Sequence, residues 1–185
     1  MKKFNIKSLL LPLIALAIVG LDIYTKFLVV ENLPLMQSVE VIGNFARFTF
    51  VYNTGITFGM FSRIDASFLP FILSITAMLA LAVVFFFYFN IAKFIRDGRP
   101  QSWARVAIMF ITGGAIGNNL LDRLFLFNKD GVMAVVDFID IGIGVHRFYI
   151  FNVADSFIVI GSIMLAILFF FFEKKQKDKS TETDI

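Results

Sequence analysis

The amino-acid sequence predicts an all-α integral membrane protein with four transmembrane helices. Hydrophobic residues make up 58% of the 185 residues, 25 residues are Phe and only 17% are charged. That is too little charge to cover the surface of a soluble domain of this size. The apolar residues gather in four near-continuous runs, each close to the ~20 residues that a helix needs to cross a bilayer. No internal repeat divides the chain, so we expect one membrane domain.

Helix one is expected at about residues 9–30, after the basic start MKK. It lacks a small-residue cleavage site and carries Asp22 and Lys26 near its far end, so we expect a retained helix rather than a signal peptide. The other helices are expected at about 68–92, 104–127 and 150–172. One domain therefore covers residues 1–172, and the polar residues 173–185 are expected to form a cytoplasmic tail.

The distribution of Lys and Arg predicts the orientation of the helices. Basic residues gather before helix one, between helices two and three, and after helix four; they are Lys2, Lys3, Lys7, Lys93, Arg96, Arg99, Arg105, Lys174, Lys175, Lys177 and Lys179. With four spans, all of these positions fall on one side of the membrane. The positive-inside rule therefore places both termini in the cytoplasm.

The two outer connections differ in character from the inner one. Residues 31–67 contain SVEVIGNFARFTFVYNTG, in which β-branched and aromatic residues partly alternate between turn residues. This pattern favours a small strand-containing element after helix one, on the outer membrane surface. The second outer connection, 128–149, contains VMAVVDFIDIGIGV, which is typical of extended or re-entrant chain.

Composition also excludes several kinds of chemistry. Without cysteine the chain has no disulfide, no thiol nucleophile and no Cys-ligated metal. Its only histidine is His146, so we expect no metal site built on paired histidines. The net charge of +3 is modest and concentrated where topology requires it, which argues against nucleic-acid binding.

Polar and ionisable residues collect near the outer ends of the predicted helices, where polarity is costly. Asp22 and Lys26 lie there in helix one, and Asp137 precedes helix four. The other members are Asn118, Asn119, Asp122 and Arg123 of helix three and Asn152 and Asp155 of helix four. Ionisable groups within membrane helices usually face a protein interior or a water-filled cavity. This group is therefore the candidate functional site.

Several of these residues also have a structural interpretation. Asp22 and Lys26 stand at i, i+4 and can neutralise each other. Asp155 can cap the N-terminus of helix four, and Asn152 can do so equally well. The glycines of GGAIG, residues 113–117, favour close helix packing over phosphate binding.

Asp137 and Asp155 flank one short loop, and two carboxyl groups offer chemistry that one does not. If they meet at the membrane boundary, both cannot ionise cheaply, so one pKa rises and the pair shares a proton. The ionised partner then activates a water, and the other protonates the carbonyl oxygen or the leaving amine, as in aspartic proteases. We assign the neighbouring Asp140 and His146 to loop solvation.

Two other functions would use similar residues. A small proton-coupled transporter could carry protons on Asp22, Asp122 and Asp155, although transporters place such acids near the bilayer midplane and often have repeat symmetry. A non-enzymatic membrane scaffold gives no reason for two acids that flank one loop. Proteolysis and proton-coupled transport are thus both consistent with the residues alone.

Five sequence blocks together resemble lipoprotein signal peptidase (signal peptidase II), a family of aspartic peptidases of the bacterial inner membrane. The blocks are DIYTK at 22–26, NTGITFGMF at 53–61, GGAIGNNLLDR at 113–123, VVDF at 135–138 and FNVADS at 151–156. Each block is weak alone, but five in the family's order on a four-span chain are specific. The resemblance runs from helix one to helix four, and it implies a site at the extracytoplasmic face of the membrane.

The resemblance implies that Asp137 and Asp155 are the catalytic pair. It also implies substrate-binding or supporting roles for Asp22, Lys26, Asn53, Gly55, Asn119, Asp122, Arg123 and Asn152. The family commonly reads Gly-Asn, two residues, Asp-Arg, whereas this chain reads GNNLLDR. We prefer Asn119 over Asn118 as the family asparagine, because i−3 spacing keeps it on the helix face of Asp122.

The activity that the resemblance implies is removal of the signal peptide from diacylglyceryl-modified prolipoproteins. Cleavage would occur on the N-terminal side of the lipidated cysteine, with no metal or other cofactor. The implied partners are these substrates, membrane lipid and inhibitors of the globomycin type.

Overall fold

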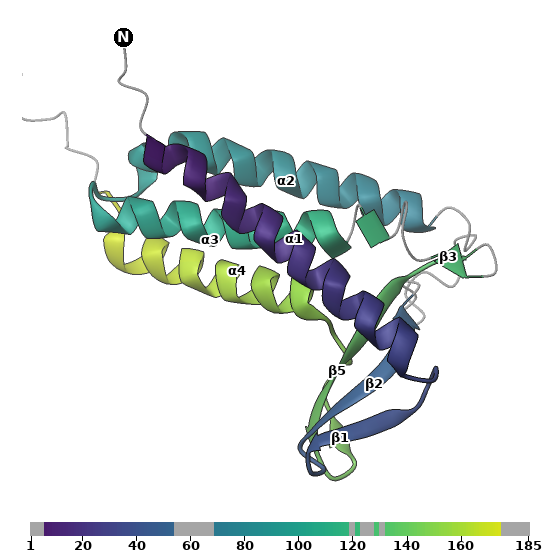
Figure 1. Cartoon of the computed structure of the whole chain (residues 1–185). Coiled ribbons are helices and arrows are strands. Elements are labelled where there is room, and N and C mark those ends of the chain that lie inside the picture. The colour runs from purple at the N-terminus through teal and green to yellow at the C-terminus, as the bar shows by residue number, and fades with distance from the viewer. Residues whose placement is uncertain (1–5, 54–68, 119–120, 123–127, 130–131, 175–185) are drawn as a thin grey trace, which may run out of the picture.

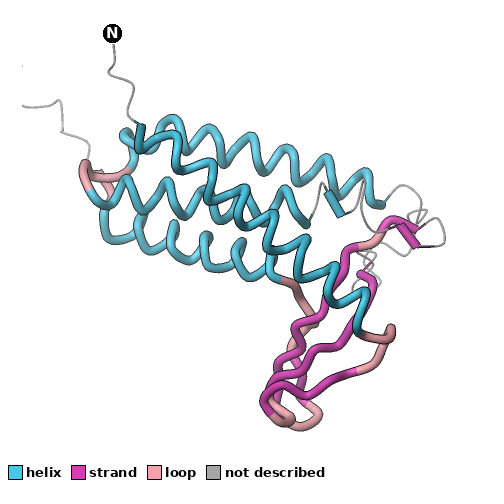
Figure 2. The backbone as a smooth tube through the Cα atoms, in the orientation of Figure 1, coloured by secondary structure: helices cyan, strands magenta, loops and turns pink. Residues whose placement is uncertain are grey.

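Helices and strands occupy opposite ends of the molecule (Figure 2). The computed structural model describes residues 6–53, 69–118, 121–122, 128–129 and 132–174. In this part of the chain, four long helices form a bundle: α1 (Ile6–Asn32), α2 (Leu69–Phe94), α3 (Arg99–Ala115) and α4 (Val153–Phe172). The strands extend sideways from the end of the bundle where α1 ends and α4 begins (Figure 1).

Helix α3 is the centre of the bundle and contacts each of the other three helices. Small residues permit this packing: a Cβ at Gly114 would lie 2.5 Å from the Ala154 carbonyl oxygen of α4, and one at Gly113 would lie 2.9 Å from the Ala15 carbonyl oxygen of α1. The predicted packing role of GGAIG is thereby confirmed. Because α3 is covered on several sides, it can carry buried polar residues such as Gln101 and Thr112.

Three described helices are long and apolar enough to cross a membrane, and they are Leu11–Asn32, Phe71–Phe94 and Val153–Phe172. The 17-residue α3 is not among these three. It begins at Arg99, before the predicted start at Ala104, because Gly98 (φ 94°) ends a tight turn and Pro100 sits in the first helical turn. Its α-helical part ends at Ala115, and residues 116–118 and 121–122 are π-helical.

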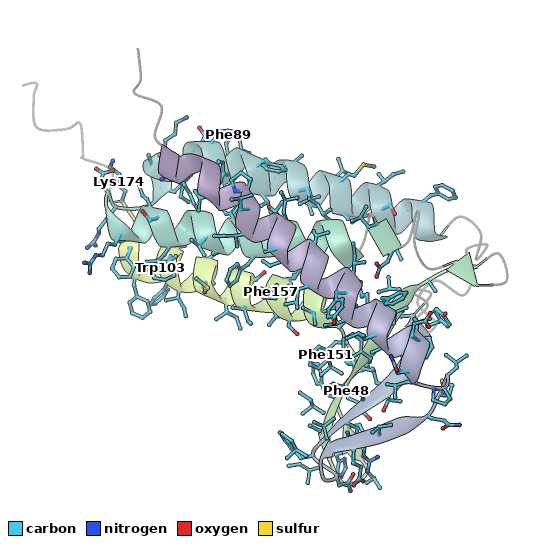
Figure 3. All side chains as sticks on the ribbon, viewed as in Figure 1. Phe48, Phe89, Trp103, Phe151, Phe157 and Lys174 are labelled. Carbon is cyan, nitrogen blue, oxygen red and sulfur yellow. The ribbon has the colours of Figure 1, made fainter. Side chains whose placement is uncertain are left out.

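The ends of α2 and α4 are joined at the end of the bundle opposite the sheet. The Arg96 amide donates to the Phe172 carbonyl at 2.9 Å, and the Lys174 amide donates to the Phe94 carbonyl at 2.8 Å. Helix α1 begins at this same end (Figure 1). The exposed side chain of Lys174 is labelled there in Figure 3.

The two outer connections combine into one four-stranded sheet with the order β1-β2-β5-β6. Its strands are β1 (Ser38–Ile42), β2 (Ala46–Asn53), β5 (Val135–Ile143) and β6 (His146–Arg147), and a separate pair joins β3 (Asn128–Lys129) to β4 (Val132–Met133). The predicted strands after α1 and the predicted extended chain before α4 are both present, and they pair with each other, which the sequence pattern does not predict. A small apolar core of Val29, Phe50, Val136 and Phe138 holds this sheet against the end of α1.

Asp140 corrects one expectation, because it is not a solvated loop residue. It is 6% exposed, on β5. Its carboxylate accepts hydrogen bonds from Thr49 Oγ1 at 3.0 Å and from Arg147 Nε at 2.9 Å. The pairing of β2, β5 and β6 creates these partners, so Asp140 ties three strands together. His146 is exposed, as expected.

Candidate functional site

The N-terminus of α4 is the centre of the candidate site, and Asn152 is its cap. The Asn152 Oδ1 accepts the Asp155 amide at 3.0 Å, and the Asp155 Oδ2 accepts the Asn152 amide at 3.2 Å. This reciprocal capping box begins the helix at Val153, after the predicted start at Ile150. Of the two capping interpretations, the structure therefore selects Asn152 as the cap and fixes Asp155 one turn inside.

Asp137 reaches the same place from the sheet. It lies on β5 opposite Val51 of β2, and Phe151, just before the cap, pairs with Ile139 two residues further along β5. Asn152 Nδ2 donates to Asp137 Oδ1 at 2.6 Å, and Asn53 Nδ2 donates to Asp137 Oδ2 at 2.8 Å. One side chain, Asn152, thus contacts both aspartates through different atoms.

Asn118 supplies the second hydrogen bond to the Asp155 carboxyl group. Its Nδ2 donates to Asp155 Oδ1 at 2.6 Å, and its Oδ1 accepts from Asn152 Nδ2 at 3.1 Å and from Lys26 Nζ at 3.4 Å. The i−3 spacing that favours Asn119 does not exclude Asn118, because residues four apart also lie on one helix face. Asn118 therefore shares a side with Asp122, since Lys26 contacts both.

A buried ionic cluster lies directly beneath this network. Lys26 Nζ pairs with Asp22 Oδ2 at 2.7 Å and with Asp122 Oδ2, and all three side chains are fully shielded from solvent. The predicted i, i+4 pair is confirmed, but the ammonium is shared between two carboxyl groups. Among the described residues, Asp122 Oδ1 has no hydrogen-bond partner. Charges this deeply buried are stable only when paired.

The cluster also holds the start of α4. Asp22 Oδ1 accepts the Ala154 amide at 2.9 Å, and this amide is one of the free N–H groups at a helix N-terminus. A carboxylate is favoured there by the helix dipole. Gly117 allows the close approach, because a Cβ at that position would lie 3.0 Å from Asp22 Oδ2. Helix α1 therefore fixes the position of the helix that carries Asp155.

Burial changes the acidity of Asp137, which is 2% exposed. The pKa of this carboxyl group is raised from 3.8 to about 6, mainly by burial and also by the nearby Asp155, although hydrogen bonds from Asn53 and Asn152 oppose the shift. A carboxyl group that titrates near neutral pH suits proton transfer better than one with an ordinary pKa.

Several predicted site residues cannot be placed. Gly55, Asn119 and Arg123 lie outside the residues that the structure describes. The structure brings together the other predicted residues, which are Asp22, Lys26, Asn53, Asp122, Asp137, Asn152 and Asp155. In the described ranges, no group of three or more His, Cys, Asp or Glu side chains is placed to hold a metal ion.

This arrangement can perform general acid–base chemistry. Two carboxyl groups from different elements share one asparagine, one of them titrates near neutral pH, and Asp155 remains partly exposed. Such a pair can hold one proton between them and use both protonation states in a single reaction.

Comparisons with known proteins agree with one family. The sequence profile of the family described as signal peptidase (SPase) II matches residues 14–171. A lipoprotein signal peptidase of Geobacillus kaustophilus (strain HTA426) is 39% identical over 165 residues, which are 89% of this chain and 95% of that protein. One from Fusobacterium nucleatum is 34% identical over 173 residues, covering 93% of each chain.

Solved structures agree as well. A structure described as a bacterial membrane enzyme, determined by the in meso method at 1.9 Å, superposes with a TM-score of 0.66 and 34% identity. It covers 90% of this chain and 94% of its own. The profile match over most of the length, together with relatives above 30% identity that are covered almost completely, places the chain in the signal peptidase II family.

Proposed function

We propose that this protein is an aspartic endopeptidase that removes the signal peptide from prolipoproteins, with Asp137 and Asp155 as its catalytic pair. The observation that carries the proposal is Asn152, which donates to Asp137 while its backbone amide and side-chain oxygen bond Asp155. The relatives named lipoprotein signal peptidase support the substrate class. The substrate that we propose carries a diacylglyceryl-modified cysteine and is cleaved on the N-terminal side of that cysteine.

The reaction needs one ionised and one protonated carboxyl group. The ionised group takes a proton from a water as the water oxygen attacks the scissile carbonyl carbon, while the protonated group donates to the carbonyl oxygen. The resulting diol then collapses. The carbon–nitrogen bond breaks, and the cysteine nitrogen leaves as an amine after it takes a proton from the pair.

The surrounding residues have supporting roles in this proposal. Asn53 and Asn118 each donate to one of the carboxyl groups, which limits their rotation. The cluster of Asp22, Lys26 and Asp122 holds α4 in place through the Ala154 amide. We further propose that Gly55, Arg123 and Asn119 contribute to substrate binding or site support, on the strength of the sequence blocks that contain them.

The membrane arrangement that fits this function has four spans in the bacterial inner membrane, with α3 as the fourth. Three helices have the length and hydropathy to cross by themselves. Helix α3 lies alongside them at the centre of the bundle (Figure 1). The basic residues at the end opposite the sheet support a cytoplasmic location for both termini and an extracytoplasmic location for the site.

Proton-coupled transport is not favoured. The acids gather at one end of the bundle, beside the sheet, rather than at mid-span, where a transporter binds its ions. The family to which the chain belongs is one of peptidases.

The test is cleavage of a diacylglyceryl-modified prolipoprotein by purified protein in detergent or liposomes. The wild-type protein is expected to release the signal peptide, and a globomycin-type cyclic peptide is expected to inhibit it. Asp137→Asn and Asp155→Asn should each abolish cleavage while the protein stays folded. Normal cleavage by either variant would contradict the catalytic pair, and no cleavage by the wild type would contradict the function.

A further inference from the structure

An apolar pocket of about 310 Å³ lies where the sheet meets α4. It is lined by Phe148, Phe151, Asp155, Ser156, Val159 and Ile160. The side chains of Phe148, Phe151, Val159 and Ile160 are apolar and take no part in the hydrogen-bond network around the two aspartates, whereas Ser156 Oγ donates to the Asn152 carbonyl oxygen at 3.0 Å. Figure 3 labels Phe151 at this junction between the start of α4 and the sheet. The pocket thus has Asp155, one member of the aspartate pair, and Ser156 on its wall, together with four apolar side chains.

The pocket is continuous with the surface of α4 that would face lipid. Val159 is 55% exposed and Ile163, one turn further along the same helix face, is 54% exposed. On the other side, Phe148 of the sheet end is 64% exposed. Exposed apolar side chains on a membrane-spanning helix are suited to hydrocarbon. An acyl chain that runs along α4 can therefore pass from the bilayer to Asp155 without crossing water.

We propose that this pocket receives an acyl chain of the lipid-modified substrate and thereby sets the position of the modified cysteine against Asp155. The inference rests on the proposed function and adds a location for the lipid. The occupant is the acyl chain that is covalently attached to the substrate, because Asp155 lines this pocket and an acyl chain bound there lies beside the residue that carries the reacting carboxyl group. A chain of the surrounding bilayer lipid would have no connection to the cleaved bond.

Another apolar pocket among the described residues does not compete for this role. It has a volume of about 320 Å³ and lies between the end of α1, at Leu28 and Val29, and the sheet residues Phe48 and Phe138. None of the residues that line it belongs to the Asp137 and Asp155 pair. A chain bound there would leave the distance between the modified cysteine and Asp155 undetermined.

The pocket acts by position and not by attraction. A chain that moves from bilayer hydrocarbon into a pocket lined by Phe, Val and Ile exchanges one apolar environment for another, so it gains little free energy from the hydrophobic effect. What the pocket provides is orientation, because it fixes one end of the substrate and reduces the motion of the bond that must meet the carboxyl groups. Blocking the pocket should therefore reduce cleavage of long-chain substrates selectively.

The experiment compares two forms of one precursor, with the cysteine carrying either long diacylglyceryl chains or a diacetylglyceryl group too short to fill the pocket. The measured quantity is the ratio of kcat/KM for the long-chain form to that for the short-chain form. Val159→Trp fills the pocket and is expected to lower this ratio at least tenfold. Ile163→Trp, on the same face but outside the pocket lining, is the matched control and is expected to leave the ratio within about twofold.

Val159→Ala gives an independent reading that does not depend on a bulky substitution. It enlarges the pocket and is expected to raise kcat/KM several-fold for precursors with methyl-branched acyl chains, relative to straight chains. Equal ratios for Val159→Trp and Ile163→Trp would overturn the proposal. So would an equal loss on both substrates with Val159→Trp, which would assign the pocket to the peptide or to bulk lipid. If the wild type cleaves neither substrate, the proposed function fails first.

Discussion

Replacing Asn152 separates two tasks that this one side chain performs. Its Oδ1 accepts the Asp155 amide and so caps α4, whereas its Nδ2 donates to Asp137 at 2.6 Å. Serine retains the first task, because Ser and Asn are about equally good N-caps. It loses the second, because its hydroxyl is too short to reach both groups. Alanine loses both tasks.

The expected magnitudes follow from these contacts. A hydrogen bond to a charged group contributes about 1.5–3 kcal/mol, so loss of the donor to Asp137 should lower kcat/KM by about 10- to 100-fold in both variants. Loss of the cap costs a further ~1 kcal/mol of stability in the alanine variant alone. In a protein of this size that corresponds to a fall of about 2–4 °C in the thermal midpoint.

The assay pairs cleavage of a lipid-modified precursor with thermal unfolding in the same detergent. The serine variant should unfold near the wild-type midpoint and cleave slowly, and the alanine variant should be impaired in both measurements. A fully active serine variant would refute the role of Asn152 in positioning Asp137. A serine variant as unstable as the alanine variant would refute the separation of the two tasks.

Three other predictions address the surroundings of the pair. Lys26→Met should lower the thermal midpoint by roughly 10 °C, because breaking a buried ion pair costs about 3–5 kcal/mol, and an unchanged midpoint would contradict the shared ion pair. The pKa of Asp137 is raised from 3.8 to about 6, mainly by burial. Between these two pH values the folded chain holds the proton that the unfolded chain has lost. The contribution of this group to stability therefore falls as the pH rises from 3.8 to about 6. Asp137→Asn should abolish that fall and be more stable than wild type at pH 7, measured by thermal scans from pH 4 to 7; a variant that is less stable at pH 7 would contradict it. Gly114→Ala should impair folding and cleavage, since its Cβ would lie 2.5 Å from a carbonyl oxygen of α4. Gly20→Ala is the control: its Cβ would have nothing within 4 Å, so it should be neutral or stabilise the protein by up to ~1 kcal/mol. Equal behaviour of the two variants would count against the close packing of α3 on α4.

Much of the fold follows from apolar periodicity and charge placement, because the bilayer leaves a chain few options. The apolar runs locate α1, α2 and α4 to within a few residues. Helix α3 is predicted less well. Its first turn is polar, and Arg99 and Ser102 there are exposed, so this turn lies outside the apolar run from which the start at Ala104 is predicted.

The candidate site divides along similar lines. Ionisable residues in apolar sequence identify Asp22, Lys26, Asp122 and Asp155, since the cost of burying them requires a reason. Helical spacing does not choose between Asn118 and Asn119, because positions three and four residues before Asp122 both lie near its face of the helix. Residues paired across strands, such as Asp140, depend on a sheet formed by segments far apart in the sequence. Local pattern contains no information on that pairing.

The ionic cluster has a consequence for the biosynthesis of the protein. Asp22 and Lys26 pair within α1, so this helix brings its own counter-ion when it enters the membrane ahead of the others. Asp122 takes its cation from Lys26, which is 96 residues earlier in the chain. Until α3 docks on α1, Asp122 is an acid without that cation. Docking of the two helices therefore both relieves this penalty and completes the ionic cluster that holds the start of α4.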